Sequence, residues 1–437
     1  MRHLGKLAGL GGAVGVIALT LSAPALAEEA AELTATSSES AYILNSLLFL
    51  ISGMVVMFMA AGFCMLESGL VRSRNAATIC LKNIALYSIA GLMYWLVGYN
   101  LMYGGNTPYF GSFTFWTHSD VDISGGYTSG SDWYFQMVFC ATAASIVSGT
   151  LAERIKLWPF LIFVAYLTGI IYPIQGSWEW GGGWLDAEWA FSDFAGSTLV
   201  HSTGGWAALV GAIVLGARTG KYGPNGEVNV MPGSSLPLAT LGTFILWLGW
   251  FGFNGGSQLA LGTAGDADAV SRIFINTNVA AAAGVVSAML LTQILYRKVD
   301  LTMALNGAIA GLVSITAEPL TPAIPEAILI GAVGGLLVVI FVPLLDKMRI
   351  DDVVGAISAH LVAGIWGTMI VPFTNGDASY VGQAVGVAAV GVFVSVASLI
   401  GWLLLKFTIG IRVTPEQELE GLDKTELGLE AYPEFSR

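Results

Sequence analysis

The sequence predicts an all-α membrane protein of about eleven transmembrane helices, and three observations lead to this fold class. Of the 437 residues, 55% are hydrophobic and only 11% are charged, whereas a soluble protein of this length needs more charge to cover its surface. Apolar runs long enough to cross a bilayer recur along the chain. The 55 glycines suit close contact between helices in a bilayer.

The apolar runs give the predicted helices and divide into two halves and a final helix. They lie at roughly 43–66, 76–103, 133–152, 157–175, 195–217, 236–256, 270–296, 301–317, 325–345, 353–373 and 380–408. The halves, about 43–217 and 236–373, each contain an odd number of helices, so they enter the membrane from opposite sides and any repeat between them is inverted. The last helix, 380–408, completes a predicted transmembrane domain over 28–408.

The N-terminal segment predicts a secretory signal peptide over 1–27. Arg2 and Lys6 precede an apolar stretch, and Ala25-Leu26-Ala27 forms a small-residue cleavage site before Glu28. An additional transmembrane helix is the alternative. Cleavage would leave the mature N-terminus in the periplasm.

The loops support the same orientation. Those on one side carry basic residues, at Arg72, Arg74, Arg154, Lys156, Arg218, Lys221, Arg297, Lys298, Lys347 and Arg349. The loops 104–132 and 174–194 on the other side carry none. Because Lys and Arg concentrate in cytoplasmic loops, the C-terminus is predicted to be cytoplasmic. The net charge of −12 argues against nucleic acid as a partner.

One motif occurs in both halves. Asp193 precedes His201 by eight residues where the fifth helix begins, and Asp352 precedes His360 by eight residues where the tenth begins. Eight residues of helix span about 12 Å, so each histidine is expected near mid-bilayer. Two inverted copies would bring the histidines together at the pseudo-two-fold axis.

His201 and His360 are the only histidines in the predicted spans. An ionisable side chain at this depth is costly and indicates function, although a structural pair that satisfies itself is the alternative. No Cys, Asp or Glu cluster completes a metal site around them, and the three cysteines lie in apolar runs without a disulfide pattern. We therefore expect no metal, no cofactor and no enzymatic activity.

Other features allow both a structural and a functional interpretation. Asp193 could cap its helix or attract a cation. The tryptophans near the outer face could form an interfacial belt or bind a cation through their rings. Gly307/Gly311 and Gly382/Gly386 suit helix contacts within or between protomers.

The C-terminal segment 409–437 begins with a capping-box pattern. Thr414-Pro-Glu-Gln417 predicts the start of a short helix, and Gly421 predicts its end. A solvated tail is the alternative.

Several motifs in fixed order resemble the ammonium transporter family (Amt/Mep/Rh). They are Glu67-Ser-Gly-Leu-Val-Arg72, Phe135-Gln-Met-Val-Phe139 leading to Leu151-Ala-Glu-Arg154, Trp180-Gly-Gly-Gly183, Asp193-Phe-Ala-Gly196 with His201, Gly249-Trp-Phe-Gly-Phe-Asn254, and Asp351-Asp352 with Gly355 and His360. The resemblance runs from the first span to the tail. It implies ammonium/ammonia uptake by a homotrimer with one pore per protomer in the bacterial inner membrane.

The resemblance also implies roles for individual residues, which are stated here as expectations. Phe139, Trp180 and Ser257 would recruit the external cation, with Asp193 preorganising the site. Phe139 and Phe253 would form a gate, Trp250 would line the path, and His201 and His360 would form a twin-histidine pore. The Trp-rich loop is slightly longer than in the shortest family examples, so Trp178 or Trp184 could take the place of Trp180.

The same resemblance implies a regulatory cytoplasmic tail at 409–437 that engages a PII-type protein. Within this expectation, ammonium would lose its proton below the recruitment site, because an isolated charge is costly in an apolar lumen. The histidines could then relay the proton. A membrane ammonium sensor and an Rh-type gas channel are the alternatives, and the short tail argues against an appended sensor domain. A polytopic membrane enzyme would need a catalytic constellation that two histidines do not supply.

Overall fold

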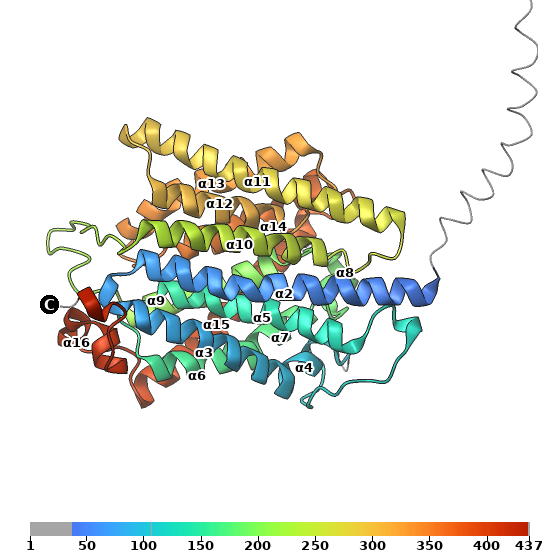
Figure 1. The fold of residues 1–437 in the computed structure, drawn as a ribbon, viewed down its shortest axis with the longest axis horizontal. Helices are drawn as coiled ribbons and strands as arrows, with labels where there is room; N and C mark the ends of the chain where they lie inside the picture. The colour runs from blue at the N-terminus through green and yellow to red at the C-terminus, as the bar shows by residue number, and fades with distance from the viewer. Residues whose placement is uncertain (1–36, 106, 436–437) are drawn as a thin grey trace, which may run out of the picture.

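The computed structural model describes residues 37–105 and 107–435, so the predicted signal peptide lies outside the described residues. Helical segments coincide with all eleven predicted runs (Figure 1). In chain order they are α2 (Ser38–Leu70), α3 (Ala76–Met93) continuing through η2 (Tyr94–Gly98) into α4 (Tyr99–Tyr103), α5 (Ser129–Thr150), α6 (Leu157–Tyr166) continuing through η4 (Leu167–Ile171) into α7 (Tyr172–Ser177), η5 (Ser197–Ser202) with α9 (Thr203–Leu215), α10 (Leu236–Gly256), α11 (Ala264–Tyr296), α12 (Leu301–Ile315), α13 (Ile324–Lys347), η6 (Ile357–Val362) with α14 (Ala363–Ile370), and α15 (Tyr380–Thr408).

The helices have the length and composition of membrane spans. In the described part of the chain, 8 helices are long and apolar enough to cross a bilayer, and Leu301–Ile315 and Ile357–Phe373 are shorter apolar helices. The remaining predicted run corresponds to α5, whose 22 residues include many small and polar ones and are mostly buried. Because α5 faces protein rather than lipid, it needs less apolar surface. The all-α membrane fold is thereby confirmed, and the helices agree with about eleven spans.

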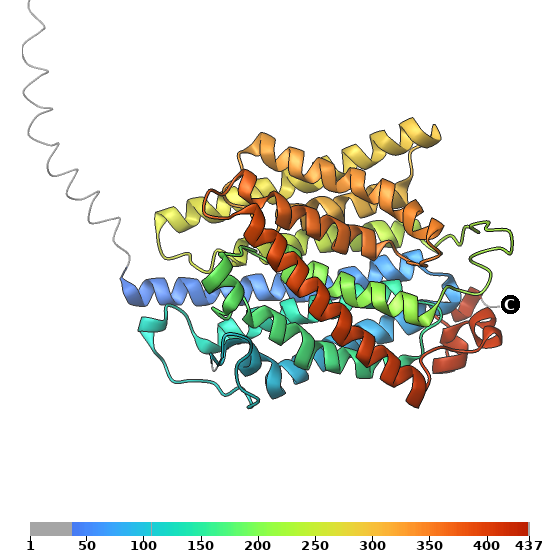
Figure 2. The same cartoon turned by 180° about the vertical axis from the view of Figure 1, so that it is seen from behind.

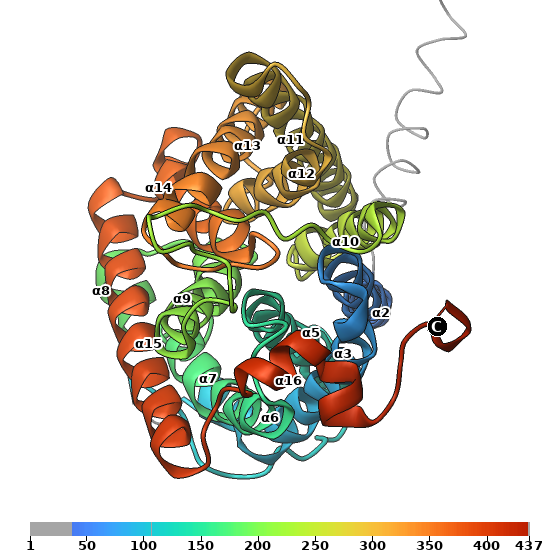
Figure 3. The ribbon, with the colours of Figure 1, turned by 90° about the vertical axis from the view of Figure 1, so that its left-hand side faces the viewer.

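Most helices run roughly parallel to one another, and α15 crosses the bundle diagonally on the rear face (Figures 1 and 2). We call the end that carries the loop 218–235 and α16 (Pro415–Glu420) the tail end. We call the opposite end, with the loop 107–128 and α8 (Trp184–Trp189), the vestibule end. Figure 3 looks along the bundle onto the tail end and shows α16 lying across the ends of other helices.

Small residues allow close helix contacts inside the chain. A Cβ atom at Gly311 on α12 would lie 2.4 Å from the carbonyl oxygen of Ala280 on α11, and one at Gly386 on α15 would lie 2.1 Å from the ring of Phe191. Contacts this close leave no room for a side chain. Both predicted glycine pairs therefore make close contacts within one chain, Gly311 between α12 and α11 and Gly386 between α15 and the segment after α8.

The two histidine-bearing helices begin in the same unusual way. Gly196 and Gly355 each stand three residues after the motif aspartate in the left-handed region, with φ values of 109° and 80°. Each is followed by a π-helical segment, η5 or η6, that carries the histidine. The segments start from opposite ends of the bundle, as an inverted repeat requires.

The C-terminal segment packs against the tail end. The predicted capping box is present at Thr414 and Gln417, and α16 ends at Gly421, so the short helix is confirmed. The Asp423 carboxylate then accepts hydrogen bonds from the backbone N–H groups of Ala77 and Thr78 at 2.9 and 2.7 Å, which caps the start of α3. The solvated-tail alternative is therefore wrong for this part of the chain.

Candidate functional site

The two histidines from opposite halves meet inside the bundle. The Nδ1 atoms of His201 and His360 lie 3.3 Å apart, and the ring centroids are 5.3 Å apart. His201 is fully buried and His360 is 4% exposed. The chain thus places two imidazoles in direct contact between η5 and η6, where the repeated motif predicted them.

This contact fixes what the neutral pair can offer to a small molecule. A hydrogen bond between two Nδ1 atoms requires one ring to donate a proton and the other to accept it. The donating ring then has a bare Nε2, and the accepting ring has a protonated Nε2. The Nε2 atom of His201 is buried without a hydrogen-bond partner among the described residues. The pair therefore presents one acceptor and one donor to its surroundings.

Asp193 holds the start of η5. Its Oδ1 atom accepts hydrogen bonds from the N–H groups of Gly196 and Ser197 at 3.0 and 2.8 Å. Its Oδ2 atom accepts from Thr198 and Leu199, both at 2.8 Å. Asp193 is fully buried, and four N–H donors at a helix start are those left without helical partners. The carboxylate thus determines where the His201 segment begins.

Aromatic rings lead from the histidines toward the vestibule end. Phe253 on α10 stacks on His201 with 5.2 Å between ring centroids, and Phe139 on α5 stacks on Phe253 at 4.0 Å. Trp250, one turn away on α10, stacks on His201 at 4.9 Å and donates a hydrogen bond from Nε1 to the Thr316 hydroxyl at 2.8 Å. The rings form a continuous aromatic path to the histidine pair.

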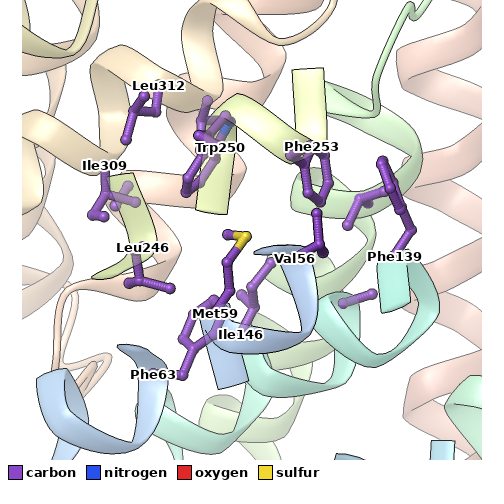
Figure 4. Close-up of a cluster of buried hydrophobic side chains, with 14 of the residues drawn as sticks. Val56, Met59, Phe63, Phe139, Ile146, Leu246, Trp250, Phe253, Ile309 and Leu312 are labelled. Carbon is purple, nitrogen blue, oxygen red and sulfur yellow. The ribbon is translucent and has the colours of Figure 1, made fainter. Parts of the chain in front are cut away.

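Aliphatic and sulfur-containing side chains fill the space beside these rings (Figure 4). Figure 4 shows Trp250 and Phe253 on α10 facing Val56 and Met59 of α2. The centroid of the Phe63 ring lies 6.2 Å from that of the His360 ring. The cluster is buried and apolar, so the polar atoms of the histidines stand out within it.

A cavity of about 300 Å³ opens beside Phe139 at the vestibule end. Phe139, Trp180 and Ser257 all line it. Trp180 meets Phe139 edge to face at 6.1 Å, and its Nε1 atom donates to the backbone carbonyl of Asp193 at 2.9 Å. The Ser257 hydroxyl donates to the carbonyl of Phe253 at 2.8 Å, which leaves the oxygen lone pairs for another partner.

The other two tryptophans of this loop do not line the cavity. Trp178 donates from Nε1 to the carbonyl of Tyr109 and packs on Phe393 of α15 at 5.0 Å. Trp184 lies 5.8 Å from Trp178 in the same cluster. Of the three candidates, Trp180 is the one that borders the cavity.

Asp132 is a cavity residue that sequence reasoning did not select. It lies in the first turn of α5, is 8% exposed, and lines the cavity together with Tyr99, Tyr103 and Tyr127. The available signal was its spacing from Phe135 and Phe139, because residues at i, i+3 and i+7 share one face of a helix. The sequence instead predicts Asp132 as the last residue of the loop 104–132.

The tail end is organised by buried ion pairs instead of rings. Arg218 contacts the Asp351 carboxylate through Nε at 2.9 Å and the Glu153 carboxylate through Nη1 at 3.3 Å, and Arg72 contacts Glu153 at 2.5 Å. Burial alone would raise the pKa of Asp351, but Arg218 and Arg154 outweigh it and hold the pKa well below its usual range. Burial would also raise the pKa of Glu153, but the positive charge of Arg218 outweighs burial and lowers that pKa.

Within the described ranges, no group of three or more His, Cys, Asp or Glu side chains is arranged to hold a metal ion. The chemistry available at the site is therefore hydrogen bonding, ring contact and proton exchange at the histidines. A cation could be held in the cavity, whereas the cluster around the histidines favours a neutral molecule.

Known proteins share both the sequence and the fold. The family model described as Ammonium Transporter Family matches residues 47–432. Ammonium transporter Amt2 of Archaeoglobus fulgidus is 40% identical over 419 residues, covering 88% of this chain and 87% of that protein. Ammonium transporter Amt1 of Haloferax mediterranei is 37% identical over 418 residues, covering 90% and 80%.

Solved structures give the same result. A structure titled Sensor Amt Protein has a TM-score of 0.84 at 35% identity and covers 90% of this chain and 100% of its own. The crystal structure of Candida albicans Mep2 has a TM-score of 0.79 at 25% identity, covering 86% and 88%. With its apolar helices and these relatives, the chain is a multi-pass membrane protein and belongs to the ammonium transporter family.

Proposed function

We propose that the chain takes up ammonium through a pore in which the cation is recruited at the vestibule end and crosses as neutral ammonia. One observation carries this proposal: the cavity, the Phe139–Phe253 pair and the His201–His360 pair follow one another in contact. Moving an isolated charge into an apolar interior costs many kcal/mol. A path of aromatic rings followed by neutral imidazoles therefore favours the passage of neutral ammonia over that of the ammonium ion.

Recruitment takes place in the cavity. The ring faces of Phe139 and Trp180 attract the cation, and each desolvated contact contributes roughly 0.5–2 kcal/mol. The Ser257 hydroxyl accepts a hydrogen bond from it. Asp193 preorganises the site without touching the cation, since its carbonyl fixes Trp180 and its carboxylate is occupied by four N–H groups.

Below the recruitment site the ammonium ion gives up its proton to the histidine relay, because desolvation favours the neutral amine over the ammonium ion. The donor and acceptor of the histidine pair then allow ammonia to pass Trp250 with hydrogen bonds on both sides, and the pair relays the proton. An Rh-type gas channel differs only in that the proton stays outside, so the transported charge separates these mechanisms.

The orientation follows from charge. The loops that carry the basic residues lie at the tail end together with the C-terminal segment. This supports a cytoplasmic tail end and a periplasmic vestibule end. In this arrangement residues 1–27 are a signal peptide, 28–408 the transmembrane domain in the bacterial inner membrane, and 409–437 a cytoplasmic regulatory tail.

The assembly and the regulator are proposed from the family. The resemblance supports a homotrimer with one pore per protomer and a PII-type protein at the cytoplasmic face. The contacts of Asp423 with the start of α3 support a regulatory tail, because a partner that moves the tail would also move a transmembrane helix.

A membrane ammonium sensor is the second candidate. The structural likeness to a protein titled Sensor Amt Protein, at 35% identity, supports this second candidate. A sensor would bind ammonium in the cavity without moving it across the membrane.

Uptake of radiolabelled methylammonium by cells that lack their own transporter separates these functions. We expect saturable uptake that falls when a protonophore collapses the membrane potential. Saturable uptake that ignores the protonophore supports the gas channel. Uptake no faster than in cells with an empty vector, from protein that reaches the membrane, contradicts transport and supports the sensor.

A further inference from the structure

The recruitment cavity contains one carboxylate that faces it directly, and that carboxylate is Asp132. Asp132, Phe135 and Phe139 lie on one face of α5, with about 10 Å of helix rise between the first and the last. The ring of Phe135 contacts that of Phe139 at 4.7 Å. Asp132 therefore stands above the aromatic path, on the side from which a cation would arrive.

Asp193 cannot supply this charge to the cavity. Both of its oxygens are occupied by backbone N–H groups of its own helix, and it is fully buried. A carboxylate that neutralises a helix start has little attraction left for a distant cation.

Asp132 differs because its hydrogen-bond partners are neutral side chains. The Tyr99 hydroxyl donates to Asp132 Oδ2, and the side chain of Gln136, one turn along α5, also donates to the carboxylate. Among the ion pairs formed by residues 37–105 and 107–435, none includes Asp132. Its negative charge is therefore uncompensated in the described chain and available to a cation.

The rest of the cavity wall suits a small organic cation. Tyr103 and Tyr127 line it beside Asp132, and tyrosine rings attract cations through their faces. The hydroxyl oxygen of Tyr103 is buried without a hydrogen-bond partner among the described residues, so it can accept an N–H donor. A volume of about 300 Å³ accommodates a partly hydrated ammonium ion or a monoalkylammonium ion.

We infer that Asp132, with Tyr103 and Tyr127, forms a cation site for ammonium and monoalkylammonium ions that precedes the Phe139–Trp180–Ser257 site. This inference rests on the proposed recruitment of a cation at the vestibule end. The site concentrates the cation and hands it on along the Phe135 and Phe139 rings. Asp132 is thus a binding residue, and its charge sets the apparent affinity.

The alternative is that Asp132 only holds Tyr99 in place, and three variants separate the two roles. Asp132→Asn removes the charge but keeps an oxygen that accepts from Tyr99. Asp132→Glu keeps the charge. Tyr99→Phe removes the hydrogen bond but keeps the charge. Asp120→Asn is the matched control, because Asp120 is an exposed loop carboxylate on the same side.

The first measurement is the concentration dependence of methylammonium uptake. We expect Asp132→Asn to raise the KM about tenfold, as for the loss of one partly screened charge contact, with the maximal rate nearly unchanged. Asp132→Glu should keep most of the wild-type affinity, Tyr99→Phe should raise the KM clearly less than Asp132→Asn does, and Asp120→Asn should leave the KM unchanged. An unchanged KM in Asp132→Asn, or equal increases in Asp132→Asn and Tyr99→Phe, would overturn the inference.

The second measurement does not depend on transport. The thermal unfolding midpoint of purified full-length protein is followed against methylammonium chloride, with sodium chloride at equal ionic strength as reference. We expect a saturable increase in the wild type that needs about tenfold more methylammonium in Asp132→Asn. No increase in the wild type overturns the site, whereas an Asp132-dependent increase without cellular uptake overturns the proposed transport and leaves the site standing.

Discussion

The two copies of the Asp–Gly–His motif have the same local structure but different surroundings. In the first copy, Asp193 is fully buried and accepts four backbone N–H bonds. In the second, Asp352 accepts backbone N–H bonds from Ala356 and from Ile357, the latter at 2.7 Å, and one hydroxyl bond, from Thr150 at 2.9 Å. The first copy borders a cavity lined by rings, and the second borders the buried ion pairs of Arg218.

This difference teaches how one repeated motif can serve two purposes. The aspartate and the left-handed glycine specify a π-helical start that carries a histidine to the centre. The neighbours then decide what each end can do. Rings and an open cavity suit a transient cation at the vestibule end, whereas multiple ion pairs suit a rigid support at the tail end.

The largest expected effect compares the two aspartates. Asp193→Ala would leave four buried N–H groups without an acceptor, and at about 1–3 kcal/mol each the loss should reach about 5 kcal/mol. Asp352→Ala removes fewer bonds at a partly exposed position, so about half that loss is expected. Thermal unfolding in detergent measures both, and equal losses would mean that the two motif copies are supported in the same way.

The next effect concerns the ion pairs of the tail end. Arg218→Ala leaves the buried carboxylates of Asp351 and Glu153 without their shared partner, which should cost about 3–5 kcal/mol. Arg272→Ala is the control, because both side chains of its ion pair with Asp268 are exposed, and about 0.5 kcal/mol is expected. A similar loss in both variants would show that burial of the pair does not matter.

The same ion pairs predict a pH dependence with a definite sign. The pKa values of Asp351 and Glu153 are lowered by folding, so the stability they contribute is present above their ordinary pKa near 4 and is lost as pH falls through the lowered folded values. The wild-type unfolding midpoint should therefore decrease on acidification below about pH 4. Arg218→Ala should flatten that decrease, and an equally steep acid limb in the variant would contradict this origin.

A moderate effect tests the aromatic path. Phe253→Ala removes the ring between Phe139 and His201, and methylammonium uptake at low concentration should fall about fivefold, which corresponds to a ring contact of about 1 kcal/mol. Phe251→Ala is the matched control, since Phe251 stacks on Phe274 of α11 instead. Equal uptake in the two variants would argue against a path through Phe253.

The smallest effect tests the tail. Asp423→Ala removes the cap of α3 and should lower stability by about 0.5–1 kcal/mol, with little change in the affinity for methylammonium. Glu420→Ala disrupts only an exposed ion pair with Lys424 and serves as control. A large increase in KM in Asp423→Ala would show that the tail end controls the vestibule end.

Much of the fold could be predicted because lipid imposes a simple requirement. Every helix that crosses the bilayer needs an apolar run, and all eleven runs coincide with helical segments. The meeting of His201 and His360 could be anticipated because a repeat of odd length inverts the second copy. The short helix at Thr414 followed from local capping chemistry, which needs no tertiary information.

The rest depends on contacts between distant residues. The ion-pair cluster at the tail end is an example. In the sequence, its members Arg72, Glu153, Arg218 and Asp351 indicate only the orientation of the loops or belong to a motif, because no local pattern shows that they come together. The predicted loop 104–132 includes Asp132 although α5 begins at Ser129, since an apolar run gives the start of a helix only to within several residues. The choice of Trp180 over Trp178 depended on the path of an irregular loop, for which periodicity gives no information.

The most direct test of the central claim is the current carried by reconstituted protein on a solid-supported membrane after an ammonium jump. The central claim is that the paired histidines carry the proton between the two ends. With His201→Ala and His360→Ala combined, we predict that the saturable current of the wild type disappears while the protein remains folded. A current of wild-type size and saturation in the double variant would contradict the claim.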